Sequence, residues 1–205
     1  DVMRDEDLVA LVEHTTGTHG KLDVLVNNAG VVTGGRLDEI DKEDIGRMVG
    51  VNMWAPLRLT QIALPHMRRQ RSGTIINISS LAGRMGVPFY AGYCASKFAM
   101  RGFSEALRRE LRPDGIHVMV VYPGGTATDM MENVEFDRFG ISIATATQVA
   151  EAIMRGLRWR QPEVFIGLGE TFMSGVNAVM PWAVDYGVDL LREQFRTAVQ
   201  NQRTT

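Results

Sequence analysis

The stretch that decides the fold runs from Leu22 to Gly30 and reads Leu-Asp-Val-Leu-Val-Asn-Asn-Ala-Gly. Its apolar run, 22–26, leads directly into small polar residues and a glycine, which is typical of a strand that ends in a loop. The same pattern recurs at 73–80, Gly-Thr-Ile-Ile-Asn-Ile-Ser-Ser, and at 116–125, where Ile-His-Val-Met-Val-Val precedes Tyr-Pro-Gly-Gly. Strands that are apolar without alternation indicate a parallel sheet covered by helices on both faces.

Helical patterns separate these strands. We predict helices over 5–16, 41–70, 90–112, 147–160 and roughly 170–200, the last broken at Pro181, and strands over 22–26, 74–80, 116–121 and 164–167. The helix at 41–70 is expected to start in a near-capping box formed by Asp41 and Asp44, and to bend at Pro56. The alternation predicts an α/β fold, a three-layer αβα sandwich around a parallel sheet, in one domain over 1–205.

Composition excludes several classes of protein. The chain of 205 residues has a net charge of −2, and no basic stretch suggests a nucleic-acid partner. Cys94 is the single cysteine and the four histidines are scattered, so we predict no metal site. No apolar run reaches the roughly 18 residues of a membrane span. The N-terminal Asp-Val-Met-Arg does not resemble a targeting peptide, so the cytoplasm is the expected location.

Three strand ends carry residues suited to chemistry, because ligands of parallel sheets bind outside the carboxyl ends of the strands. Gly30 allows a ligand to approach the backbone, although a plain tight turn explains it equally well. Ser79-Ser80 offers hydroxyl groups that can steady an oxygen gaining charge, and a turn cap is the alternative. Pro123-Gly124 ends the third strand, where the alternative is an ordinary loop.

A fourth feature is Tyr93-Cys-Ala-Ser-Lys97, near the start of a predicted helix. Tyr93 and Lys97 are four residues apart and therefore share one helix face. A free tyrosine has a pKa of about 10, too high for proton transfer near neutrality. A neighbouring ammonium group favours the phenolate, so we expect Lys97 to lower the pKa of Tyr93.

These features together resemble the short-chain dehydrogenases/reductases. The motifs Asn27-Asn28-Ala29-Gly30, Asn52, Ser80, Tyr93-xxx-Lys97 and Pro123-Gly124 stand in the order shown by that family, and Tyr93 follows Ser80 by the family's usual 13 residues. That interval selects Ser80 over Ser79 and Tyr93 over Tyr90. The resemblance covers about residues 1–167 and implies a Rossmann-like, single-domain oxidoreductase that uses NAD or NADP.

The resemblance also implies a role for each of four catalytic residues. Tyr93 would be the general acid/base that protonates a carbonyl oxygen during reduction to an alcohol. Lys97 would lower the tyrosine pKa and bind the nicotinamide ribose, and Ser80 would hold the substrate oxygen. Asn52 would order a water molecule that links Lys97 to a proton relay, although a helix residue bonded to backbone is the alternative.

Further residues would line the cofactor. By resemblance they are Tyr93 and Lys97 themselves, Asn28, Ala29 and Gly30 on the adenine-ribose side, Pro123, Gly124, Thr126 and Thr128 along the nicotinamide and pyrophosphate, and Asp1 beside the adenine. Thr126 stands where the family usually has an aliphatic residue, which is a mild departure because contacts there are made by the backbone.

One departure from the family is larger. The sequence contains no GxxxGxG or GxGxxG motif, so the N-terminal βαβαβ portion with its pyrophosphate-binding loop is missing from this chain. The residues that choose between NAD and NADP are missing with it. We expect the chain to be part of a longer protein and to be inactive alone. The alternative is a catalytically silent Rossmann-like binding or scaffold protein.

The remaining segments concern substrate and partners. Segment 126–145 lies where the family keeps its substrate loop, and Met130, Phe136 and Phe139 in it suggest an apolar substrate, although such residues suit a lid packed on the core equally well. The helical tail, 170–205, is expected to bury its apolar residues against the domain or a second subunit, with a peripheral membrane contact as the alternative. By analogy with the family, helices 41–70 and 90–112 would pair in a homodimer or homotetramer.

Overall fold

The computed structural model describes residues 1–124 and 144–203. Four parallel strands, β1 (Val24–Asn27), β2 (Gly73–Ile78), β3 (Ile116–Tyr122) and β4 (Glu163–Phe165), form a sheet in the order β1-β2-β3-β4. The predicted α/β fold with a parallel sheet is confirmed, and each predicted strand is present with its ends shifted by at most two residues.

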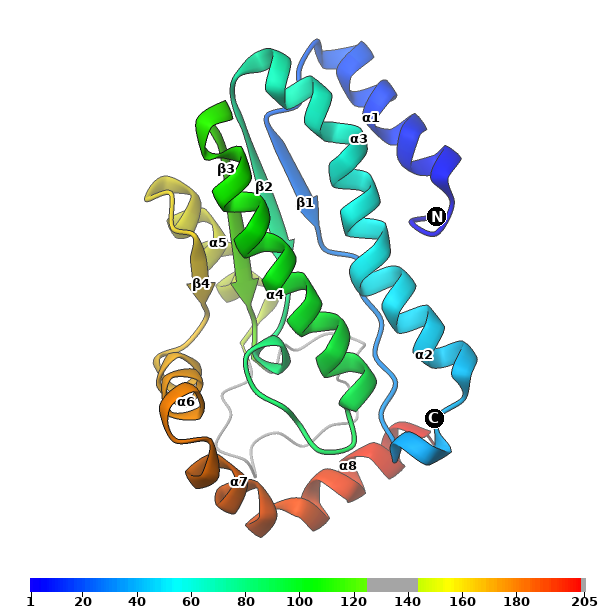
Figure 1. The fold of residues 1–205 in the computed structure, drawn as a ribbon, viewed down its shortest axis with the longest axis vertical. Coiled ribbons are helices and arrows are strands. Elements are labelled where there is room, and N and C mark those ends of the chain that lie inside the picture. Colours follow the sequence, from blue (N-terminus) through cyan, green and yellow to red (C-terminus); the bar gives the residue numbers. More distant parts are fainter. Residues whose placement is uncertain (125–143, 204–205) are drawn as a thin grey trace.

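Helices cover the two faces of the sheet unequally (Figure 1). On one face lie α1 (Asp5–His19), α3 (Ala55–Gln70) and α4 (Ala91–Leu111), which share a core with alternate strand residues such as Leu25, Ile75 and Val118. On the other face α5 (Ala146–Arg158) packs against Ile76, Met119 and Val164. No helix of the described residues covers that second face over β1, where Val24 and Val26 are about half exposed.

The predicted helix at 41–70 is two helices joined by a wide turn. α2 (Lys42–Val49) leads into a π-helical turn, Gly50–Trp54, which continues as α3. The interruption therefore precedes Pro56, which lies in the first turn of α3. The expected capping box is wrong, because the Asp41 side chain makes no capping bond.

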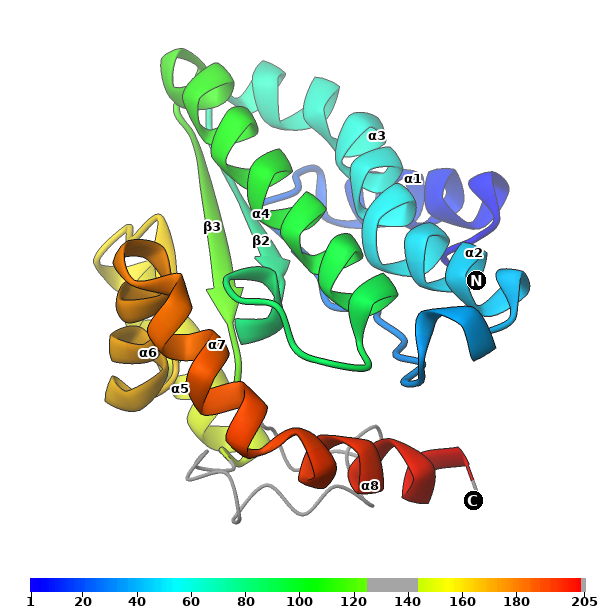
Figure 2. The same cartoon turned by 60° about the horizontal axis from the view of Figure 1, so that its bottom comes forward.

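The C-terminal tail forms three successive helices, α6 (Leu168–Val179), α7 (Pro181–Leu190) and α8 (Arg192–Arg203). The predicted break at Pro181 is confirmed, and a second one occurs at Leu191. Figure 2 shows the three helices running across the end of the molecule toward which the strands point. Of the predicted substrate segment, 126–145, only Ala144 and Thr145 are among the described residues, and Thr145 caps α5. No helix in the described ranges is long and apolar enough to cross a bilayer.

Candidate active site

Lys97 is buried where the second turn of α4 meets the end of β2. The residue is 5% exposed, and its Nζ donates a hydrogen bond to the carbonyl oxygen of Ile78 at 3.1 Å. Burial disfavours the charged form and lowers the pKa of Lys97 to about 8. An ammonium group has three donors, so Lys97 can hold a further oxygen-bearing group beside the strand end.

Asn52 is held in the π-helical turn by three hydrogen bonds. Its Oδ1 accepts from the Val31 backbone N–H at 2.8 Å, and its Nδ2 donates to the Val31 carbonyl at 2.9 Å and to Ser96 Oγ at 3.0 Å. Ser96 Oγ in turn donates to the Tyr93 carbonyl at 2.7 Å. A single π-type turn inside a helix frequently marks a functional site. Here it fastens the loop after β1 to the start of α4.

Gly30 stands between these two side chains. A Cβ atom added to Gly30 would lie 3.4 Å from Asn52 Oδ1 and 3.5 Å from Lys97 Nζ. The missing side chain therefore leaves a small space that is walled by a carboxamide and an ammonium group. Such a space suits the close approach of a polar ligand to the backbone.

Ser80 and Tyr93 form the other half of the site. The Ser80 hydroxyl lies near the Tyr93 phenol and lowers its pKa as a hydrogen-bonding group, and Ser80 Oγ accepts from the Ala82 N–H at 3.1 Å. Burial raises the pKa of Tyr93 above its ordinary value, and the Ser80 hydroxyl offsets this only in part. Lys97 Nζ lies 5.7 Å from the centre of the Tyr93 ring. The lowered tyrosine pKa that the sequence predicts is therefore wrong for this arrangement, because desolvation of the phenolate prevails.

Ser79 has a different task from its neighbour. Its Oγ is buried and donates to the Lys97 carbonyl at 2.9 Å, so it ties α4 to the end of β2. Gly83 permits this contact, since a Cβ there would come within 2.4 Å of Ser79 Oγ and 2.7 Å of the Lys97 carbonyl oxygen. The 13-residue interval thus separates an anchoring serine from one that faces the tyrosine.

The other predicted cofactor residues make fewer described contacts with the residues of the site. Asn28 and Ala29 are exposed just after β1, and the Pro123 carbonyl accepts from the Leu81 N–H at 2.8 Å beside the Ser80 turn. Gly124 ends the described range, and Thr126 and Thr128 lie outside the described residues. Asp1 is exposed, and its described bonds stay local, to Met3, Arg4 and Asp7.

Sequence reasoning missed a chain of buried polar groups beneath the site. Asn27 Nδ2 donates to Asn77 Oδ1 at 2.7 Å and to Thr60 Oγ1 at 3.2 Å, and Asn77 Nδ2 donates to Ser104 Oγ at 2.9 Å. These bonds tie α3, β1, β2 and α4 together in that order. An asparagine in the middle of an apolar strand, as in the Ile-Ile-Asn-Ile of β2, was the available signal.

A family model described as short chain dehydrogenase matches residues 1–138. The 3-ketodihydrosphingosine reductase of Bacteroides thetaiotaomicron is 40% identical over 133 residues, which are 65% of this chain and 49% of that protein. The ketoacyl reductase HetN of a Nostoc species is 32% identical over 193 residues, 90% of this chain and 67% of that protein. The chain thus spans about half the length of the first of these relatives.

Two solved structures add a comparison of folds. A short-chain dehydrogenase from Streptomyces avermitilis superposes with a TM-score of 0.77 at 26% identity, covering 96% of this chain and 78% of that one. The structure of ElxO with NADP bound gives a TM-score of 0.68 at 30% identity, covering 75% of this chain and 66% of that one.

Proposed function

This chain belongs to the short-chain dehydrogenase family, and from that premise we propose that it carries the catalytic residues of an NAD(P)-dependent enzyme that reduces a ketone to an alcohol. The observation that carries the proposal is the buried Lys97, whose Nζ donates to the Ile78 carbonyl and lies 5.7 Å from the centre of the Tyr93 ring, with Ser80 beside the phenol. A silent scaffold has no physical need for this combination, since a buried ammonium costs stability.

Tyr93 is the proton donor in this proposal. Because burial raises its pKa, the phenol stays protonated at neutral pH and is ready to give its proton to a carbonyl oxygen that gains charge. Ser80 Oγ, which lies near the phenol, holds the same substrate oxygen. The state of Tyr93 favours reduction near pH 7, whereas alcohol oxidation needs the phenolate and hence a higher pH.

The residues around Gly30 fit a nicotinamide dinucleotide. The space that a Cβ would fill lies between Lys97 Nζ and Asn52 Oδ1, so the ammonium can donate to hydroxyl groups of a ribose there. Bound nicotinamide supplies the hydride, and the chain positions and polarises the substrate. Asn28, Ala29, Pro123 and Gly124 are proposed to line the same ligand, as are Thr126, Thr128 and Asp1. Both NAD and NADP remain candidates, and ElxO, a relative at 30% identity, has NADP bound.

A ketone on an apolar chain is the proposed substrate class. Two relatives carry names that describe reduction of a keto group, one on dihydrosphingosine and one on an acyl chain. The apolar residues of segment 126–145 agree with such a substrate. A panel of 3-keto acyl esters and steroid ketones, followed by NADPH and NADH absorbance, identifies both substrate and cofactor.

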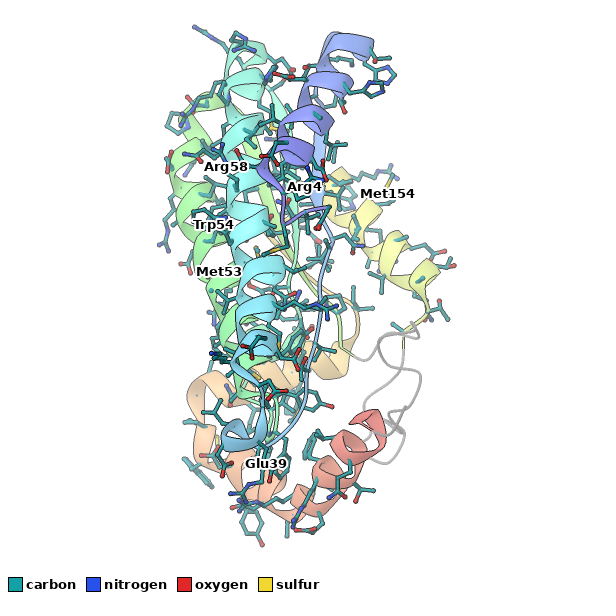
Figure 3. The ribbon with its side chains drawn as sticks, turned by 90° about the vertical axis from the view of Figure 1, so that its right-hand side faces the viewer. Arg4, Glu39, Met53, Trp54, Arg58 and Met154 are labelled. Carbon is teal, nitrogen blue, oxygen red and sulfur yellow. The ribbon has the colours of Figure 1, made fainter. Side chains whose placement is uncertain are left out.

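A second copy of the chain is the proposed partner. The outer surfaces of α3 and α4 enclose a cleft lined by Trp54, Leu57, Leu64 and Phe103, among others. Figure 3 shows Trp54 and Arg58 on this outer surface, and Trp54 is 60% exposed. An aromatic and an arginine beside an apolar cleft are typical of interface anchors. Trp54→Glu is expected to reduce the mass measured by light scattering to that of the monomer.

The proposed function is tested by Tyr93→Phe in the complete protein. Only the acid/base proton is removed, so kcat is expected to fall about a thousandfold while NADPH binding, measured by fluorescence, is retained. Tyr186→Phe is the matched control, because Tyr186 is 69% exposed on α7 and lies outside the site. Unchanged turnover in Tyr93→Phe refutes the assignment. Cofactor binding by the wild-type protein without turnover of any ketone supports the silent scaffold instead.

A further inference from the structure

Arg84 is a partly buried cation close to the site that the proposed chemistry does not use. It follows Ser80 by four residues, at the end of the short turn η3 (Leu81–Gly83), and its side chain is 16% exposed. The guanidinium carbon lies 5.4 Å from the centre of the Tyr122 ring and 5.6 Å from that of Phe165. Stacking on two aromatic rings replaces part of the water that a buried guanidinium loses.

A carboxylate completes this arrangement. An Arg84 Nη donates to Glu163 Oε1 at 3.5 Å, and the Tyr122 hydroxyl donates to the same oxygen at 3.3 Å. The Tyr122 and Phe165 rings stack with centres 5.0 Å apart. We call Arg84, Tyr122, Glu163 and Phe165 the Arg84 cluster. Since Tyr122 directly precedes Pro123 and Gly124, the cluster holds the end of β3, from which the proposed cofactor residues begin.

Arg84 also holds helix α6. Its Nε donates to Ser174 Oγ at 2.9 Å, and its backbone carbonyl accepts from Asn177 Nδ2 at 3.2 Å. Ser174 and Asn177 are three residues apart and share one side of α6, and Ser174 is 2% exposed. On other sides of the helix, Phe172 and Val179 are 71% and 81% exposed. Polar bonds to Arg84 thus have a large part in docking α6.

The turn between Ser80 and Arg84 is short and internally bonded. The Gly83 N–H donates to the Ser80 carbonyl at 2.8 Å, and the Arg84 N–H donates to the Leu81 carbonyl at 2.8 Å. Leu81 N–H is bonded to Pro123, as described above. A turn with these bonds moves as a unit, so a displacement at Arg84 is passed to Ser80.

We propose that Arg84 is a positioning residue, which sets Ser80 through the η3 turn and fixes α6 as a wall on the substrate side of the site. The inference rests on the proposed function. The far end of the tail is seated on the opposite side, because a Cβ on Gly34 would meet both Tyr90 and Val199 of α8 at about 3 Å. Figure 2 shows the tail helices passing below the strand ends between these two contacts.

Hydrogen exchange tests the docking of α6 without any need for activity. In Arg84→Gln, amides of α6 are expected to exchange about tenfold faster, because the helix loses its charged partner, while amides of α3 keep their rates. Arg109→Gln is the matched control, since Arg109 is exposed on α4 and pairs with Glu105. Equal α6 exchange in both variants overturns the docking role.

Kinetics of the complete protein test the positioning of Ser80. Arg84→Gln is expected to lower kcat about tenfold and to raise KM for the ketone, with the dissociation constant of NADPH unchanged. Ser174→Ala breaks only the bond from Arg84 Nε to α6 and is expected to raise KM alone. The double variant is expected to have the same KM as Arg84→Gln, because both single changes remove the same interaction between Arg84 and Ser174. Arg84→Lys, which keeps the charge, should recover part of kcat.

The failures are distinguishable. If Tyr93→Phe keeps its turnover, the proposed function is refuted. The hydrogen-exchange result for α6 does not depend on that outcome. If Tyr93→Phe is inactive and Arg84→Gln has wild-type kcat and KM, the positioning role is refuted. A lowered melting temperature in Arg84→Gln with unchanged kcat and KM also refutes it, because that pattern describes a purely structural residue.

Discussion

Lys97 at the candidate active site is 5% exposed and ionisable, whereas Trp182 on α7 is 66% exposed and apolar. Each residue occupies the surroundings that simple partitioning disfavours. The ammonium group of Lys97 donates to the Ile78 carbonyl and borders the space beside Gly30, which Asn52 Oδ1 borders as well. A costly group that is held this firmly indicates a use for it. The exposed side of α7 has no such surroundings, so the unfavourable contact of Trp182 is with water alone.

Exposed apolar side chains follow one another along one side of α7, which we call the outer stripe. Trp182, Tyr186 and Leu190 are four residues apart on α7 and are each more than 60% exposed, while Val184 on the other side is buried. Folding of the chain therefore depends on the inner side of α7 and hardly on the outer one. A substitution is therefore expected to change the free energy of unfolding strongly at the site. At the outer side of the tail it is expected to change it little.

The largest change in the free energy of unfolding is expected from replacing Lys97. Its pKa is about 8 in the folded chain and ordinarily 10.5, so the unfolded chain binds more protons between these values. The penalty is complete below pH 8 and disappears as the pH rises to 10.5. At about 1.4 kcal/mol for each pKa unit, it is about 3 kcal/mol. Lys97→Met is therefore expected to raise the free energy of unfolding by about 2 kcal/mol at pH 7, after loss of the bond to Ile78.

Urea denaturation at pH 7 and pH 10.5 measures this gain, which should be absent at the higher pH. Lys42→Met is the control, because Lys42 has an exposed side chain. Catalysis is expected to be lost in Lys97→Met, as for a residue retained for function against stability. A variant that is less stable than the wild type at pH 7 would contradict the view of Lys97 as a costly group.

Much of the fold was predictable because burial on both faces leaves apolar runs in the sequence, as in 22–26 and 116–121. The division of 41–70 at Gly50–Trp54 was not predictable. It is accompanied by bonds from Asn52 to Val31 and Ser96, which are distant in the sequence. In the same way, the Tyr93–Lys97 spacing pointed to a shared helix face. It could not show that burial would raise the pKa of Tyr93.

Arg84 shows the same limit from another side. Its partners Glu163 and Ser174 are 79 and 90 residues away in the sequence, and no local pattern marks them. A lone arginine in a Gly-Arg-Met segment is usually a solvated residue. Motifs of short range therefore locate the catalytic residues, whereas the groups that position them depend on the packing of distant elements.

The smallest expected effects come from α7 and test the other side of the comparison. Val184→Ala removes two buried methyl groups and is expected to lower the free energy of unfolding by about 1 to 2 kcal/mol. Trp182→Ser removes a far larger side chain and is expected to change it by less than about 0.5 kcal/mol, since exposed substitutions away from special contacts are nearly neutral. Urea denaturation of both variants at one pH measures the difference. A larger loss in Trp182→Ser than in Val184→Ala would mean that the outer stripe of α7 is covered in solution, and light scattering on the same samples would show whether a second copy covers it.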